Sequence, residues 1–120
     1  DDAESDEALI DALAPEVMHL HPYDPIDVLG VPLAALHYSD GDPIRTIVMA
    51  ANDRNLDADG NLKGLRDVDC TAGVAGALVG ALGGIESFPD DWVKDTVEAN
   101  KAVYGIDLEA NARSFCESVY

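Results

Sequence analysis

The chain has 120 residues, which fits a single domain, and 48% of them are hydrophobic, enough to form a core. Its formal net charge is −17, because 24 acidic residues stand against only 7 basic ones. This balance argues against nucleic acids and anionic membranes as partners, since both bind proteins through a positive patch.

Six helices are predicted from apolar periodicity and capping residues, in chain order over 5–20, 27–38, 43–51, 69–83, 90–104 and 108–119. Pro15 is expected to disturb the middle of the first helix. Asp42 is suited to cap the third, with Pro43 at its first position. Residues 52–66 are polar and aperiodic, which predicts a loop. No stretch alternates with the period of a strand, so the predicted fold class is all-α.

The faces of the last three predicted helices carry particular expectations. Ala72, Gly76, Gly80 and Gly84 lie four apart on the fourth helix. Because a glycine inside a helix costs about 1 kcal/mol relative to alanine, we expect neighbouring backbones to pack closely there and the helix to be buried on most sides. The last two helices are expected to bury apolar side chains, with Trp92 as a core anchor.

The acidic surplus has two interpretations, an ordinary solvated surface or an adaptation to high salt, and composition does not separate them. Two cysteines, Cys70 and Cys116, are too few for a disulfide scaffold. No signal peptide is visible, and no apolar run approaches the length of a membrane span. We therefore expect a soluble, cytoplasmic protein with reduced thiols.

The strongest candidate for chemistry is the pair Asp67 and Asp69, which stands where the polar loop enters the glycine-rich helix. Two carboxylates separated by a single residue at such a junction can turn toward one site. Hard oxygen ligands of this kind suit Mg²⁺, Mn²⁺ or Ca²⁺. An Asp-x-Asp pair alone is also common in any Asp-rich chain, as a helix cap and a solvated residue.

The sequence from Arg66 through Cys70 into the small-residue helix, followed by Gly84, Pro89 and Trp92, resembles the C-terminal signature of the ADP-ribosylglycohydrolase family. There an Asp-x-Asp-Thr-type motif enters a helix of small residues, and a Gly-x-x-x-x-Pro-x-x-Trp turn follows. The segment 32–52 is similar to the helix-turn-helix that precedes the motif in the family. The resemblance covers roughly residues 27–104.

This resemblance implies an orthogonal multi-helix fold, present here in part, and hydrolysis of ADP-ribosyl or related ribosyl glycosidic bonds. It implies two divalent cations, Mg²⁺ or Mn²⁺, with Asp67, Asp69 and Cys70 on the C-terminal side of their site. The chain departs from the family pattern at Cys70, where a threonine is commoner and a thiol matches Mg²⁺ poorly. The family's N-terminal ligand cluster and its acidic catalytic residue have no counterpart here.

We therefore expect residues 1–120 to be the C-terminal portion of a single hydrolase domain, inactive without its N-terminal portion. The catalytic residues would lie on that portion. An alternative from another class is a non-catalytic helical module of the same fold, since some family members have lost hydrolysis.

The segment before the motif carries weaker candidates. Asn52 and Asp53 are candidates to line the substrate pocket. Relative to the family pattern, which usually has a short glycine turn at this place, residues 53–66 resemble an inserted segment. Within this segment, Asn55, Asp57 and Asp59 resemble the first half of a Ca²⁺-binding loop. Position 12 of such a loop is Arg66 instead of an acid, which favours a polar turn near the site over a Ca²⁺ site.

Overall fold

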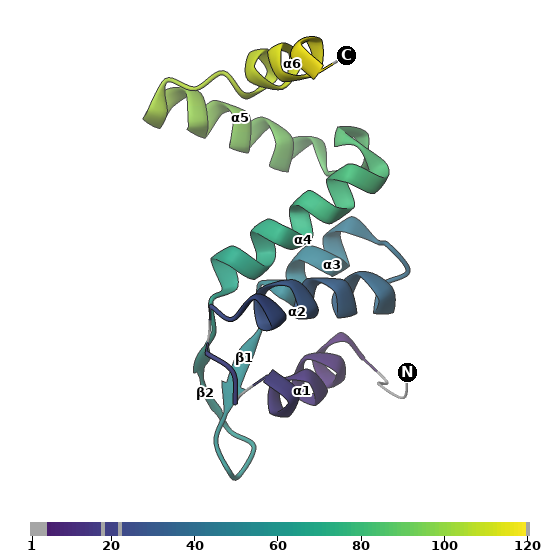
Figure 1. Cartoon of the computed structure of the whole chain (residues 1–120), viewed down its shortest axis with the longest axis vertical. Coiled ribbons are helices and arrows are strands. Elements are labelled where there is room, and N and C mark those ends of the chain that lie inside the picture. Colours follow the sequence, from purple (N-terminus) through teal and green to yellow (C-terminus); the bar gives the residue numbers. More distant parts are fainter. Residues whose placement is uncertain (1–4, 18, 22, 120) are drawn as a thin grey trace. The chain divides into compact units, whose positions relative to one another are not determined.

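The computed structural model of the chain describes residues 5–17, 19–21 and 23–119. These residues belong to two compact units, Asp1–Ser87 and Phe88–Tyr120. The elements of the first unit are α1 (Asp6–Val17), α2 (Pro25–Tyr38), α3 (Pro43–Ala50), β1 (Arg54–Leu56), β2 (Leu62–Leu65), α4 (Val68–Gly83) and the 3-10 turn η1 (Ile85–Ser87) (Figure 1). The second unit holds α5 (Asp90–Tyr104) and α6 (Leu108–Val119). The prediction of an all-α class is confirmed, because the two short strands are the sole sheet in the described residues.

Local chemistry at the helix ends agrees with the sequence. The Asp42 carboxylate accepts a hydrogen bond from the backbone N–H of Arg45, 2.7 Å away, and caps α3. Pro43 occupies the first turn of that helix, where its missing N–H costs nothing. The expectation for Pro15 was wrong, because α1 continues through it. α2 begins at Pro25, two residues earlier than predicted, so that Pro32 lies inside this helix.

The core of the first unit lies where α4 packs against α2 and α3. The buried apolar side chains among the described residues include Ala14, Val17, Val31, Ala35, Met49, Ala50, Ala75 and Val79. α4 contributes Thr71, Ala75 and Val79, which lie four residues apart on one stripe. The Thr71 hydroxyl donates a hydrogen bond to the carbonyl oxygen of Ala50, 2.9 Å away, and so ties the first turn of α4 to the end of α3.

The expected close approach of neighbouring backbones is not found at Gly73 and Gly76 of α4. A Cβ added at Gly73 would meet nothing within 4 Å among the described residues, and one at Gly76 would meet only the Ile47 Cδ1, 4.0 Å away. The helix is buried along one stripe and not on most sides. The prediction failed because small residues permit a close approach without requiring one.

The expected loop over 52–66 is instead a β-hairpin. β1 and β2 are antiparallel, with Arg54 opposite Leu65 and a register shift after Asn55. At the tip, the Asp57 carboxylate accepts hydrogen bonds from the backbone N–H groups of Asp59 and Asn61, at 2.9 and 2.8 Å. These bonds close the turn in the way that aspartate side chains commonly do.

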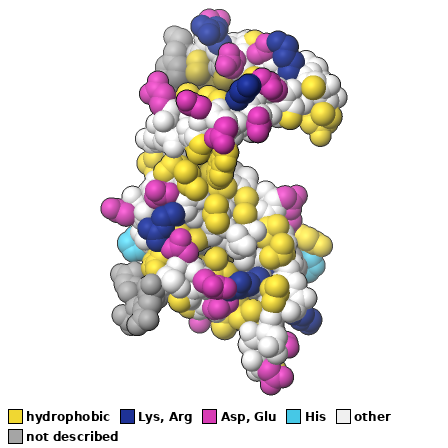
Figure 2. Space-filling view, turned by 180° about the vertical axis from the view of Figure 1, so that it is seen from behind, with side chains coloured by type: hydrophobic (Ala, Val, Ile, Leu, Met, Phe, Trp, Pro, Cys, Tyr) yellow, Lys and Arg dark blue, Asp and Glu magenta, His cyan; other side chains and the backbone are white. Residues whose placement is uncertain are grey.

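The second unit has no buried residue in α5 or α6. Trp92, expected to be a core anchor, is 39% exposed, and Val103, Phe115 and Val119 are exposed as well. The prediction of a covered apolar face is therefore not met by the described residues. Figure 2 shows apolar side chains at the surface among many acidic ones. In the described part of the chain, no helix combines the length and apolar character that crossing a bilayer requires.

Candidate metal centre

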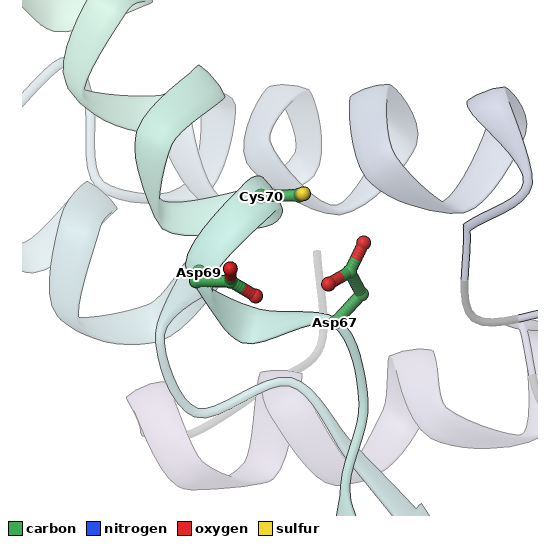
Figure 3. Close-up of side chains that lie close together, drawn as sticks. All are labelled: Asp67, Asp69 and Cys70. Carbon is green, nitrogen blue, oxygen red and sulfur yellow. The ribbon is translucent and has the colours of Figure 1, made fainter.

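The candidate centre lies at the entry to α4. One ligand atom of each of Asp67, Asp69 and Cys70 lies within 4.8 Å of the others, and among the described residues this is the only group of three such side chains. The three side chains come from the N-cap and first turn of the helix and border one space (Figure 3). The predicted ligands are therefore brought together. Asp69 and Cys70 are exposed, and Asp67 is half-buried.

The Asp67 carboxylate makes no capping bond to the backbone of α4, although Asp67 occupies the N-cap position. One of its oxygens lies within 4.8 Å of the Cys70 Sγ. The hydrogen bond with Asp67 is the largest influence that raises the pKa of the Cys70 thiol, and the negative charges of Asp67 and Asp69 add to it. Cys70 is therefore held as a thiol, which is a poor ligand for a hard cation.

The donor chemistry fits Mg²⁺ or Mn²⁺ through the two carboxylates. Such ions take a few protein carboxylates and complete their shell with water or substrate oxygens. The first turn of a helix carries partial positive charge, which disfavours a cation, and the negative charges of Asp67 and Asp69 oppose this effect. Cys70 fits better as a hydrogen-bond partner than as a direct ligand.

Directly before the pair, Arg66 turns its side chain into the first unit. The guanidinium contacts the Asp27 Oδ2 through Nε at 2.8 Å and through an Nη atom at 2.7 Å. The side chains of Arg66 and Asp27 are 1% and 0% exposed. Further hydrogen bonds reach the Asn55 Oδ1 at 2.7 Å and the Leu20 carbonyl oxygen at 3.2 Å. This buried residue therefore joins β2 to α2 and β1.

A second carboxylate shares the same guanidinium. The Asp53 Oδ2 lies 3.7 Å from the Arg66 Nε, and neither this oxygen nor the Asp27 Oδ1 has a hydrogen-bond partner among the described residues. Burial and the nearby charge of Asp27 raise the pKa of Asp53 to about 6, against the opposing effect of Arg66. The cluster thus buries two acids against one base.

The two candidates for the substrate pocket differ in their surroundings. Asn52 is exposed, and its side-chain amide donates a hydrogen bond to the Val48 carbonyl oxygen, 2.7 Å away. Asp53 is buried in the arginine cluster and borders an apolar pocket between α1, α2 and α3 that is too narrow for a water molecule. Its contacts in this chain are those of a structural residue, and a pocket role stays a prediction.

The half-loop for Ca²⁺ is not formed by the residues that suggested it. The Asn55 side-chain oxygen accepts from Arg66, and the Asp57 carboxylate is occupied by its own turn. Arg66, which stood at the last position of that loop, is instead the buried anchor of the hairpin. Sequence reasoning missed this role, and the sole signal was a single arginine next to the acidic pair.

The comparisons with known proteins assign the chain to a family. The model of one family, described as ADP-ribosylglycohydrolase, matches residues 3–119. Neither the curated proteins nor the solved structures include a match to the chain. The matched range contains both the acidic pair and the helices around it. The chain belongs to the ADP-ribosylglycohydrolase family.

Proposed function

We propose that this chain supplies the C-terminal side of a divalent-cation site in a hydrolase of ADP-ribosyl or related ribosyl glycosidic bonds. Membership of the family supports the reaction class. The observation that carries the metal site is the convergence of Asp67 and Asp69 at the start of α4, with ligand atoms within 4.8 Å.

The roles of the residues follow from their positions. Asp67 and Asp69 would hold Mg²⁺ or Mn²⁺, two ions in the complete site, and Cys70 would orient Asp67 through its thiol hydrogen. Bound cations would supply electrostatic stabilisation of oxygens as the glycosidic bond breaks, and would orient a water molecule. The remaining ligands and the general acid or base would come from an N-terminal portion of the same enzyme.

Metal binding by this chain tests the first part of the proposal. Titration of Mn²⁺, followed by electron paramagnetic resonance, should show binding to the 120-residue chain. The variants Asp67→Asn and Asp69→Asn should each weaken it by about tenfold or more, since losing even a supporting residue of a metal site typically costs that much. Asp57→Asn is the matched control, because Asp57 is also an exposed aspartate but lies at the hairpin tip.

Activity tests the second part. An enzyme that joins this chain to an N-terminal portion should release ADP-ribose from an ADP-ribosylated peptide, and Asp67→Asn should abolish most of the turnover. Binding of Mn²⁺ that is equal in the Asp67→Asn and Asp57→Asn variants would refute the assignment. Metal binding without hydrolysis by the joined enzyme would favour the alternative, a non-catalytic module of the same fold.

A further inference from the structure

We propose that Arg66 is a positioning residue for the carboxylate pair, acting through its buried ion pair with Asp27. This inference rests on the proposed metal site and adds a residue that contacts neither metal nor substrate. Arg66 immediately precedes Asp67, yet its side chain points into the first unit, where it meets α2 and β1.

The backbone of Arg66 is fixed along with its side chain. Its N–H donates a hydrogen bond to the carbonyl oxygen of Asp53, 3.1 Å away, at the open end of the hairpin. The guanidinium meets a side chain from α2, a side chain from β1 and a backbone carbonyl, so three separate segments restrain it. Asp67 follows one peptide bond later, and its backbone therefore starts from a fixed point.

A second restraint lies on the other side of the pair. The Thr71 hydroxyl contacts the carbonyl oxygens of Ala50 at 2.9 Å and Asp67 at 3.3 Å. Arg66 and Thr71 thus hold the chain on both sides of residues 67–69, and Asp69 between them is exposed. Ligands held on a rigid frame lose less freedom when a cation binds, which raises affinity.

Burial of Arg66 with Asp27 and Asp53 costs folding free energy that a purely structural contact could avoid. Apolar residues of similar volume often replace a buried ion pair with no loss of stability. Here two acids share one base, and two carboxylate oxygens lack a hydrogen-bond partner among the described residues. What this arrangement adds is direction, because the planar guanidinium fork binds only in fixed geometries. The benefit of the costly cluster is therefore that it fixes the geometry of the backbone where α4 begins.

The test uses the 120-residue chain and compares two destabilised variants. Arg66→Gln removes the ion pair next to the site, and Val79→Ala removes buried volume from α4 about three turns further along. Both should melt at lower temperature. At a temperature where both are folded by circular dichroism, Arg66→Gln should bind Mn²⁺ about 10- to 100-fold more weakly, and Val79→Ala should bind as the wild type does.

Amide hydrogen exchange without metal gives an independent reading. In Arg66→Gln, the amides of residues 67–69 should exchange faster relative to the rest of α4. In Val79→Ala, exchange rates in α4 should change without a larger increase at residues 67–69. Arg66→Lys, which keeps the charge but lacks the fork, replaces Arg66→Gln if that variant does not fold, and should show the same two effects.

The outcomes separate this inference from the proposed function. Wild-type Mn²⁺ affinity in a folded Arg66→Gln or Arg66→Lys variant would overturn the positioning role and leave the metal site standing. Equal losses in Arg66→Gln and Val79→Ala would also overturn it. If the wild-type chain does not bind Mn²⁺, the proposed function fails, and the exchange data alone decide whether Arg66 orders residues 67–69.

Discussion

Replacing Asp53 by asparagine should stabilise the protein above neutral pH and leave it almost unchanged in acid. The side chain is buried beside Asp27 and Arg66, and its pKa is raised from 3.8 to about 6. The folded state therefore binds more protons than the unfolded chain between these two values. Stability that is fully present below about pH 4 is lost as the pH rises toward 6 and stays lost above it.

The magnitude follows from the same shift. A change of 2.2 units, from 3.8 to about 6, corresponds to about 3 kcal/mol at roughly 1.4 kcal/mol for each unit. Asparagine is close in shape to a protonated aspartate and cannot ionise. The variant should therefore gain up to about 3 kcal/mol in free energy of unfolding over the wild type at pH 7.5, and close to none at pH 4.

Urea denaturation of both proteins at a series of pH values, followed by circular dichroism, measures this difference. The large net charge affects wild type and variant almost equally, so the difference isolates position 53. Asp57→Asn provides a control of opposite sign, because it should lower the free energy of unfolding at pH 7.5. The backbone hydrogen bond from Asn61 lowers the pKa of Asp57 and so favours its ionised form in the folded state. A difference between wild type and Asp53→Asn that is the same at pH 4 and pH 7.5 would refute the reasoning.

Three further results are expected. Arg66→Ala should lower the free energy of unfolding by about 3–5 kcal/mol in urea melts, since it leaves a buried carboxylate unpaired; a loss below 1 kcal/mol would contradict the burial of the pair. Thr71→Val should cost about 1 kcal/mol in the same assay through its lost hydrogen bond to α3, and an unchanged midpoint would count against that bond. Asp67→Asn should lower the pKa of the Cys70 thiol and speed its alkylation by iodoacetamide at pH 8, with unchanged kinetics speaking against the contact.

Features set by neighbours in the sequence could be predicted, and the helix caps show why. Asp42 and Asp107 each accept a hydrogen bond from a backbone N–H three residues later, so the whole interaction is contained in four residues. The acidic pair at the start of α4 is of the same kind, because its two members are two residues apart. Local spacing was enough to place these side chains in space.

The hairpin could not be predicted because its strands are short and irregular. β1 has three residues and β2 has four, and the register shift after Asn55 interrupts the alternation that identifies a strand. Leu62 and Leu65 are exposed, so no buried face marks the second strand either. The apolar faces of α5 and α6 were recognised, but periodicity identifies a face without telling what covers it.

The partner of Arg66 could not be predicted either, since Asp27 lies 39 residues earlier. The other two arginines of the first unit follow the same pattern: Arg45 pairs with Asp6 and Arg54 with Asp11, at separations of 39 and 43 residues. Each arginine thus connects a later segment to α1 or α2. In a chain with so few cations, these long-range pairs are a principal use of positive charge.

This use of the arginines has a consequence for the acidic pair. Within the described residues, neither Asp67 nor Asp69 forms a salt bridge with a lysine or arginine, although Arg66 is their immediate neighbour. Arg66 instead neutralises charge in the interior and leaves the outward side negative. Two carboxylates that face one space without a cation from the chain create a field that favours a cation from solution. Under the proposed function, the sequence order Arg-Asp-x-Asp would separate two tasks at one helix entry, because the inward-directed arginine would fix the position of the acids and the acids would bind the cation.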